Sequence, residues 1–508
     1  MVWLKRDLRL TDHHPLNAAN NVALSKGHSL LLLYVIEDDY WNLNEHSFRH
    51  FEFIRDSLME LRQKLKIKYS QNLLVMRGSA SNCFRSLHRD LNISAVHSHE
   101  ETGIGWTYDR DIELDKLFRQ LQIPWTQYPS GGVIRKLGSR DTWKAKQEVR
   151  LLQTCLKEPS QIAPPPTIIW DEQIIDNFSL PILTNSTIQK GGRREGLKIF
   201  KDFLHSRVRN YQKSISKPGL ARISCSRLSP HLSFGTLSIR EVMQATWTRM
   251  REAKQQQDAY LSRNLSAFQS RLHWHCHFIQ KLEDQPSLEF KCMHSAFEGM
   301  REPHHDEDKL QRWITGRTGF PFVDACIRSL HQTGYLNFRM RAMIVSFAAY
   351  HLFLDWRKIN PLLAALFTDY EPGIHLSQLQ MQSGVTGINA LRIYNPIKQG
   401  IEHDPNGNFI REYVPELSHI PKEEIHQPSD KYLKPIADLK ADLAFAKSEI
   451  SKVRRSSGFR DEAKTVYQRL GSRKKKRKAI SKRRTSQNQQ TTLMTRREVN
   501  RIKASNCP

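Results

Sequence analysis

Three histidines alternate within the stretch QSRLHWHCHFIQKLE, residues 269–283. On a β-strand, His273, His275 and His277 would share one face and could bind zinc, whereas on a helix only His273 and His277 lie on the same face. The segments around this stretch have helical periodicity, so we expect a helix. The sequence therefore predicts no three-histidine metal site, and we interpret the two histidines that share a face as a polar packing pair.

The serine-rich stretch SCSRLSPHLSFGTLS, residues 224–238, precedes a segment with helical periodicity. Backbone N–H groups at the start of a helix, together with the hydroxyls of Ser226 and Ser229, can hold a phosphate group. Serines at such positions are also ordinary helix N-caps. The stretch alone does not distinguish the two interpretations, and the surrounding motifs must decide between them.

The elements that position these residues form two predicted domains. Short apolar runs such as SLLLLYVIED (29–38) alternate with helical patterns over residues 1–128, which predicts an α/β domain with a doubly wound parallel sheet. Residues 129–190 are rich in proline, glycine and serine and are predicted to be an interdomain linker. Nearly every segment of residues 191–450 has helical periodicity, which predicts a larger all-α domain.

The net charge of +26 is unevenly distributed. Residues 451–508 carry 19 Lys and Arg against 3 Asp and Glu, so we expect a disordered basic tail that attracts nucleic acid non-specifically. Residues 1–450 still carry a net charge of +10, which indicates a folded surface that faces a polyanion. Nucleic acid is therefore the partner class that the composition favours.

Cysteines and apolar runs bear on the cellular environment. The seven cysteines are an odd number, are widely scattered and include no C-x-x-C pair, which favours a reducing compartment over a disulfide framework. No run of 18 apolar residues occurs, and charged residues follow the first methionine where a signal peptide would have its apolar core. We therefore expect a cytoplasmic, monomeric protein with no membrane partner and no bound metal.

Several motifs occur in one order over residues 2–417: VWLKRDLRLTDH (2–13), the serine-rich and histidine stretches, WITGRTGFPFVDACIRSLHQTGYLNFRMR (313–341), SFAAYHLFLDWR (346–357), RIYNPIKQG (392–400) and FIREYVPEL (409–417). In these motifs the chain resembles the photolyase/cryptochrome family. The resemblance implies an α/β antenna domain and an all-α domain that holds FAD, with a possible second antenna chromophore whose identity the sequence does not specify.

The resemblance also implies which residues hold the FAD. A tyrosine and part of the serine-rich stretch match the family's phosphate-binding positions, an aromatic residue matches a position beside the flavin, and an acidic loop with its arginine partner matches the ring edge. Without the resemblance, Asp369 and Glu371 could equally well be surface charges on an exposed loop. The expected cofactor residues are Tyr211, Cys225, Ser226, Arg227, Leu228, Ser229, Phe268, Arg341, Asp369, Tyr370 and Glu371.

The chain departs from the family's pyrimidine-dimer repair enzymes at the lesion. It keeps the stacking tryptophan as Trp274, but Leu379 and Met381 occupy the positions of the flavin-proximal and the lesion-facing tryptophans. Trp356 and Trp313 match the two outer members of the family's tryptophan chain, so either another aromatic residue replaces the proximal one or these two are packing residues. The residues expected to contact DNA are Arg271, Trp274, His275, Asn337, Phe338 and Met381.

The function that the resemblance implies is that of a deoxyribodipyrimidine photolyase, a carbon–carbon lyase. Reduced, photoexcited FAD would donate an electron to a pyrimidine dimer flipped out of UV-damaged DNA, with Trp274, Trp356 and Trp313 as the expected catalytic aromatic residues. The alternative is a cryptochrome-like blue-light photoreceptor with the same flavin fold and no repair. A nucleic-acid-binding protein without flavin would explain the charge but not the motifs.

Overall fold

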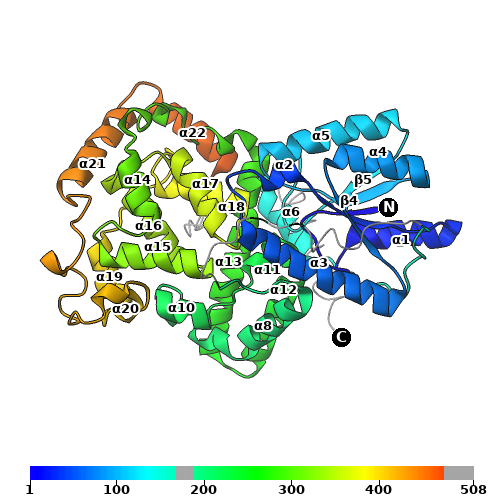
Figure 1. Ribbon diagram of the computed structural model, residues 1–508, viewed down its shortest axis with the longest axis horizontal. Helices are drawn as coiled ribbons and strands as arrows, with labels where there is room; N and C mark the ends of the chain where they lie inside the picture. The colour runs from blue at the N-terminus through cyan, green and yellow to red at the C-terminus, as the bar shows by residue number, and fades with distance from the viewer. Residues whose placement is uncertain (168–177, 179, 181–186, 474–508) are drawn as a thin grey trace, which may run out of the picture.

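The computed structural model describes residues 1–167, 178, 180 and 187–473, and shows an α/β lobe beside a larger helical lobe (Figure 1). The sheet of the α/β lobe is entirely parallel, with the strand order β3-β2-β1-β4-β5. This confirms the predicted doubly wound sheet, whose order reverses between β1 and β4. The strands are β1 (Val2–Leu4), β2 (Leu32–Ile36), β3 (Leu73–Arg77), β4 (Val96–His99) and β5 (Trp125–Tyr128).

Helices cover both faces of this sheet because its central strands are apolar throughout. Leu32 and Ile36 of β2 pack with α1 and α3 on one face, whereas Leu33 and Val35 pack with α4 and α5 on the other. Residues that alternate along a buried strand thus serve two cores. These helices are α1 (His14–Lys26), α3 (Phe48–Tyr69), α4 (Ala80–Leu91) and α5 (Gly105–Gln120), and the short α2 (Asp38–Trp41) precedes α3.

The segment predicted to be a linker contains a helix, α6 (Arg140–Leu152), which corrects the expectation for residues 129–190. Trp143 and Leu151 of α6 are buried against residues of α8 (Arg193–His205), α12 (Ile239–Gln255) and α13 (Ala259–Asp284). The proline- and glycine-rich flanks obscured this amphipathic helix in the sequence. Most of residues 168–186 lie outside the described residues.

The helical lobe confirms the predicted all-α domain. Helix α13 packs closely against α18 (Pro372–Gln382), since a side chain at Gly373 of α18 would collide with the backbone of Ile279 in α13. The remaining helices are α9 (Tyr211–Ser214), α10 (Pro218–Ser224), α11 (Ser229–Ser233), α14 (Glu307–Ile314), α15 (Pro321–Thr333), α16 (Phe338–Ser346), α17 (Trp356–Leu366), α19 (Pro396–His403), α20 (Asn408–Tyr413), α21 (Ala441–Arg454) and α22 (Phe459–Leu470).

Helix α22 corrects the prediction that the chain is disordered from residue 451 onward. Phe459 stacks on His294 with ring centroids 4.0 Å apart, and Leu470 is fully buried. The segment was predicted to be disordered because its high content of Lys and Arg outweighed the few apolar residues that form one face of this helix. The remainder of the predicted tail, residues 474–508, lies outside the described residues. In the described part of the chain, no helix combines the length and apolar character needed to cross a membrane.

The first turn of α3 docks the α/β lobe onto the helical lobe. Ser47 Oγ donates to the carbonyl of Ala365 (2.6 Å), and Arg49 Nη1 donates to that of Leu366 (3.1 Å). The last carbonyls of a helix lack partners within it and carry a partial negative charge, so hydroxyl and guanidinium donors stabilise this end of α17. The contact fixes the start of the loop that follows α17, which carries the acidic pair.

Candidate cofactor site

The acidic loop between α17 and α18 is held by an arginine from α16. Arg341 Nη2 donates to both carboxylate oxygens of Asp369, at 3.0 Å each, and the Arg341 guanidinium lies 4.0 Å from the centre of the Phe367 ring. Burial raises the pKa of Asp369, but the charge of Arg341 and a hydrogen bond from Ser229 outweigh it, so the pKa lies below its ordinary value. The site therefore holds a buried carboxylate in its ionised form.

The predicted phosphate-binding residues lie next to this carboxylate. Ser229 begins α11 and contacts Asp369 directly, which joins the serine-rich stretch to the acidic loop. Tyr211 packs edge-to-face against Phe268 with ring centroids 5.9 Å apart, and its hydroxyl contacts Arg271. Leu228 is buried, whereas Cys225 and Ser226 are half-buried. The structure thus gathers residues from five separate helices or turns around one site.

Arg227 is held by Tyr335 and Gln189, which no sequence pattern had indicated as site residues. Its backbone has a positive φ of 59°, its guanidinium lies 3.7 Å from the centre of the Tyr335 ring, and its Nη2 donates to Gln189 Oε1 (3.0 Å). Tyr335 stands in the quoted motif GYLNFRMR, but no spacing rule linked it to Arg227. The stacked arginine is a second fixed cation beside the site, near Asp369 and Arg341.

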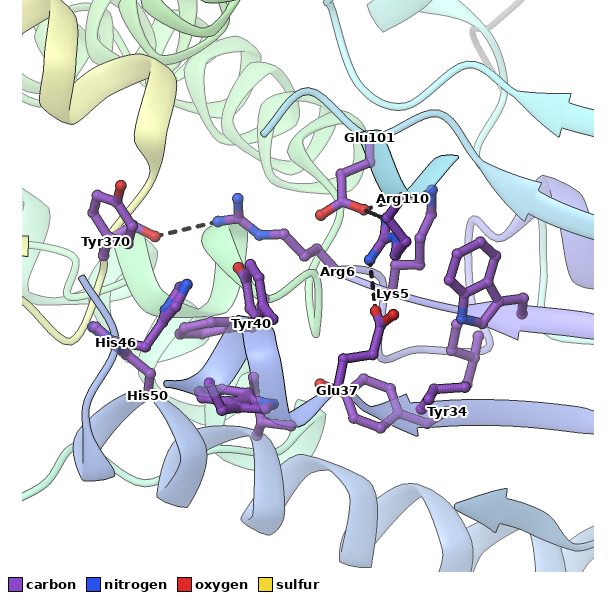
Figure 2. A pocket seen from close by; sticks show the side chains of 16 residues that line it. Lys5, Arg6, Tyr34, Glu37, Tyr40, His46, His50, Glu101, Arg110 and Tyr370 are labelled. Carbon is purple, nitrogen blue, oxygen red and sulfur yellow. Dashed lines mark hydrogen bonds and ion pairs between the residues drawn. The ribbon is translucent and has the colours of Figure 1, made fainter. Parts of the chain in front are cut away.

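Tyr370 and Glu371, the last two residues of the acidic loop, face the α/β lobe. Tyr370 lies near the rings of His46 and His50, with centroids 6.0 and 6.1 Å away, in the cavity drawn in Figure 2. Glu371 Oε2 accepts from Arg6 Nη2 at 2.9 Å. Burial raises the pKa of Glu371 above its ordinary value, although Arg6 opposes that shift. The loop therefore lies between the two lobes rather than within one.

Buried polar atoms without hydrogen-bond partners gather on α13, α18 and the acidic loop. Such atoms are rare in folded proteins and usually indicate a bound polar group or water. A flavin dinucleotide presents many hydrogen-bonding atoms along its ring edge and diphosphate, so the residues present fit FAD. In these elements the unpartnered atoms are Nδ1 and Nε2 of His275, Oγ1 of Thr368, the hydroxyl of Tyr370, Oε1 of Glu371, Nε2 of His375, Nε2 of Gln378 and Oε1 of Gln382.

The residues expected to contact DNA separate into exposed and buried groups. Trp274 is 38% exposed and Phe338 is 47% exposed, and Arg271 is exposed as well. Asn337 is buried, with its side-chain amide donating to the carbonyl of Ile215 (2.9 Å), and Met381 is buried too. Only the exposed group presents side chains that DNA can reach without a local rearrangement.

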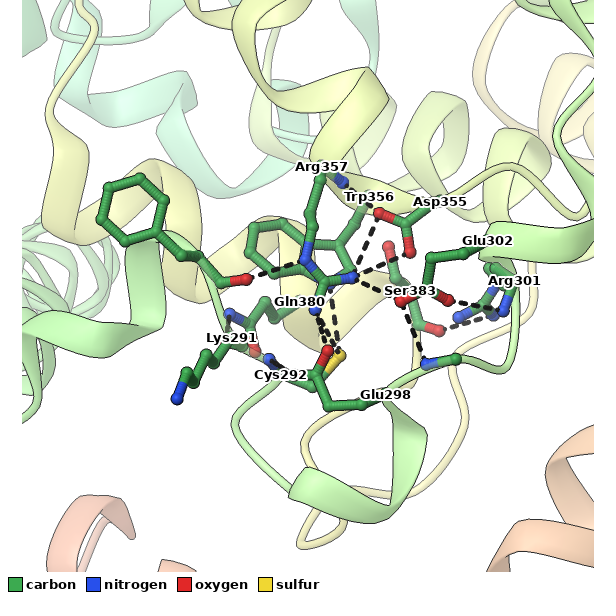
Figure 3. A network of polar contacts seen from close by, with 12 residues as sticks. Lys291, Cys292, Glu298, Arg301, Glu302, Asp355, Trp356, Arg357, Gln380 and Ser383 are labelled. Carbon is green, nitrogen blue, oxygen red and sulfur yellow. Dashed lines mark hydrogen bonds and ion pairs between the residues drawn. The ribbon is translucent and has the colours of Figure 1, made fainter.

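The two outer tryptophans are both fully buried. Trp356 Nε1 donates to the thiol sulfur of Cys292 (3.4 Å), and the neighbouring Arg357 joins the carboxylates of Asp355 and Glu302 around it (Figure 3). None of the ring–ring contacts among the described residues includes Trp356 or Trp313. An aromatic residue that replaces the missing proximal tryptophan is therefore not in ring contact with either of them.

The histidine stretch lies in α13, as predicted. His273 contacts Gln147 (3.2 Å), and His277 is buried beside Arg140 and Trp143, which confirms the interpretation as polar packing. A second imidazole cluster was missed, because its members come from the start of the chain and from β4. His13 Nε2 and His99 Nδ1 both contact Asp7 Oδ2, at 3.0 and 2.6 Å. His13 Nδ1 accepts from the backbone of Leu16, so its Nε2 carries the proton that it donates to Asp7.

Comparisons with known proteins match both lobes. Residues 1–148 match the family model described as DNA photolyase, and residues 268–452 match that described as the FAD binding domain of DNA photolyase. The chain is 26% identical to the deoxyribodipyrimidine photo-lyase of Vibrio cholerae, over 84% of this chain and 92% of the relative. It is 24% identical to the cryptochrome DASH of Gloeobacter violaceus, over 84% and 88%.

Solved structures resemble the whole fold. A class III photolyase from Agrobacterium tumefaciens superposes with a TM-score of 0.77 at 24% identity, over 90% of this chain and 97% of the other. An archaeal photolyase from Sulfolobus tokodaii, described with two FAD molecules, superposes with a TM-score of 0.72 at 26% identity, over 89% and 99%. A cryptochrome from Synechocystis superposes with a TM-score of 0.77 at 22% identity, over 88% and 98%, so structures with either kind of name share this architecture.

Proposed function

Because the chain belongs to the photolyase/cryptochrome family, we propose that it is an FAD-dependent, blue-light-driven lyase that repairs pyrimidine dimers in UV-damaged DNA. The observation that carries this proposal is the buried Asp369 carboxylate. Arg341 holds it beside Ser229 and a group of unpartnered polar atoms. When bound, FAD would supply the one-electron chemistry.

The protein's own residues would bind and orient the cofactor. The Asp369 carboxylate would accept a hydrogen bond from an N–H group of the flavin ring, and Arg341 keeps that carboxylate charged and fixed. Arg227 and the backbone around Ser229 would face the negatively charged diphosphate. Burial of this cluster would exclude water from the reacting ring, which strengthens each of these electrostatic interactions.

The exposed aromatic residues support a DNA substrate. A damaged base pair is less costly to extrude from the duplex than an intact one, which gives selectivity for lesions. Trp274 would then stack on the flipped-out dimer, a contact worth about 1–3 kcal/mol per base. The net charge of +10 on residues 1–450 would add affinity that does not depend on sequence.

A cryptochrome-like photoreceptor is the second candidate. Phe338 and Met381 stand where the family's repair enzymes have polar and stacking contacts to the lesion, and Met381 is buried. Relatives named cryptochrome DASH cover as much of this chain as those named photo-lyase. A protein of this kind would bind FAD through the same residues and leave dimers intact.

A repair assay separates the two candidates. We expect blue light and the reduced protein to convert cyclobutane dimers or (6-4) products in defined DNA duplexes back to pyrimidines, with product measured by chromatography. Trp274→Ala should weaken binding of the damaged duplex by about 5- to 150-fold, the equivalent of one lost stacking contact. Trp247→Ala, a half-buried tryptophan of α12, is the matched control. Unrepaired DNA of both lesion types, with FAD still bound, would favour the photoreceptor.

The outer tryptophans give a prediction for photoreduction. We expect Trp356→Phe to slow the light-driven reduction of oxidised flavin at least several-fold, because indole is more readily oxidised than a phenyl ring. The Arg357 guanidinium lies 4.9 Å from the Trp356 ring, and the carboxylates of Asp355 and Glu302 offset its positive charge. A radical cation on Trp356 is therefore not strongly repelled. Transient absorption after a blue flash measures the rate. An unchanged rate would make Trp356 a packing residue.

A second chromophore, if the protein holds one, is proposed to bind at the carboxyl edge of the sheet. Ligands of doubly wound folds bind in the crevice where the strand order reverses. The cavity of Figure 2 lies at this edge, and Arg110 crosses it to pair with Glu37 (3.0 Å) and Glu101 (2.7 Å). A polar chromophore would displace part of this ion network.

A further inference from the structure

Arg6 leaves the end of β1 and reaches across to the helical lobe. Its Nε donates to the carbonyl of Ser233 at the end of α11 (3.0 Å), and its Nη2 donates to the carbonyl of Tyr370 (3.2 Å) and to Glu371 Oε2 (2.9 Å). Figure 2 shows the side chain extended toward Tyr370 between the two lobes. One guanidinium from the α/β lobe thus joins two segments of the helical lobe.

The contacts of Arg6 add to those that hold the acidic loop from the helical lobe. Arg341 holds the side chain of Asp369 from α16, and Ser233 Oγ donates to the Asp369 carbonyl (3.2 Å). Arg6 then holds the next two residues and also Ser233 itself. Asp369 is therefore tied to the helical lobe, whereas Tyr370 and Glu371 are both tied to the α/β lobe.

Glu371 depends on Arg6 for its charge partner. The Arg6 and Glu371 side chains are only 17% and 9% exposed, and among the described residues no other ion pair involves Glu371. Its second oxygen, Oε1, has no hydrogen-bond partner, and Glu371 and His275 both line a second cavity between the lobes, distinct from that of Figure 2. A buried carboxylate without Arg6 would have to turn away or take up a proton, because an unpaired buried charge is costly.

We propose that Arg6 is a positioning residue through which the α/β lobe sets the acidic loop against the flavin. The inference rests on the proposed function, since it assumes that the acidic loop meets the cofactor. It assigns the α/β lobe a direct part in the flavin site, separate from any antenna chromophore. Arg6 acts through Glu371 and the loop backbone rather than by touching the cofactor.

A double-mutant cycle tests this role on the full-length holoprotein. The variants are Arg6→Gln, Arg6→Lys, Glu371→Gln and the Arg6→Gln/Glu371→Gln pair, and the readouts are the FAD dissociation constant by equilibrium dialysis and the flavin midpoint potential. We expect Arg6→Gln to weaken FAD binding about tenfold or more, the cost of one buried charged hydrogen bond, and Arg6→Lys to restore part of it. With Glu371→Gln already present, Arg6→Gln should weaken FAD binding less than it does alone, because only the contacts of Arg6 to the carbonyls of Ser233 and Tyr370 are then lost.

Arg135→Gln is the matched control, because Arg135 also pairs with a glutamate of the helical lobe (Glu283, 3.4 Å) but donates its hydrogen bonds to Gln127 and the carbonyl of Glu101 rather than to the acidic loop. It should lower the unfolding temperature without changing FAD binding by more than about twofold. Arg6→Gln and Glu371→Gln effects that multiply independently, or an unchanged dissociation constant and potential, would overturn the positioning role.

If Arg6→Gln does not fold, Glu371→Asp replaces it, since shortening the acid by one methylene breaks the 2.9 Å contact while Arg6 stays in place. The same loss of FAD affinity is expected from this variant, and retention of wild-type affinity would overturn the proposal. Wild-type protein without flavin would overturn the proposed function together with this inference. Flavin-containing wild type with an unaffected variant would overturn the inference alone.

Discussion

Asp369→Asn is expected to strip most of the FAD from the purified protein. The substitution keeps the shape of the side chain but removes the charge that Arg341 binds with two 3.0 Å contacts. Breaking a buried charge pair by removing one partner costs about 3–5 kcal/mol, equivalent to a loss of affinity of roughly 100-fold or more if the cofactor bears that cost. The ratio of flavin to protein absorbance after dialysis measures the outcome.

Asp284→Asn is the control for a general effect on stability. Asp284 also pairs with a buried arginine, Arg140 (2.9 Å), at the end of α13 and away from the acidic loop. Both variants should unfold at a lower temperature than the wild type, but only Asp369→Asn should lose flavin. Wild-type flavin content and an unchanged flavin spectrum in Asp369→Asn would remove this carboxylate from the site.

Removal of residues 474–508 is expected to produce the largest change in DNA binding. This segment carries 12 Lys and Arg against a single Glu. Each cation that neutralises a phosphate adds about 0.9 to the slope of log K against log salt concentration, so the deletion should weaken binding to undamaged duplex and make that slope shallower. Discrimination in favour of damaged DNA should persist, because Trp274 remains. Fluorescence anisotropy over a salt series measures both quantities.

The boundary of this deletion follows from α22. A truncation at residue 451 would remove Phe459 and Leu470 from the core and lower stability as well as charge. A variant with the order of residues 474–508 scrambled keeps the charge and should bind undamaged duplex as the wild type does. Loss of discrimination with an unchanged salt slope would instead mean that the tail recognises lesions.

Much of the architecture could be predicted because its signals are local. The apolar run around β2 predicted a buried central strand, and helical periodicity placed His273 and His277 on one face of α13. The family resemblance implied that Arg341 pairs with Asp369, and the structure joins them. The two periodicity predictions share one cause, since the period of apolar residues is a property of neighbouring residues, whereas the ion pair could be expected only from the resemblance.

Predictions based on amino-acid composition were wrong in two segments where an amphipathic helix is present. Proline and glycine around α6 suggested a linker, and the Lys and Arg content around α22 suggested disorder, yet both helices bury an apolar stripe. A few buried residues, such as Trp143 and Leu470, are enough to dock a short helix against an existing core. Average composition does not record which residues of a segment share a face.

Contacts between distant parts of the chain were decided only by the tertiary structure. Arg6 and Glu371 are separated by 365 positions, and Asp7 and His99 by 92. No periodicity or spacing rule relates such residues, because the packing of the two lobes brings them together. The amino-acid sequence by itself thus determined most of the elements, the domain types and the residues whose side chains could take part in chemistry. The docking of the lobes determined which charges are buried, which are paired and which polar atoms remain for a ligand, since burial and pairing depend on three-dimensional neighbours.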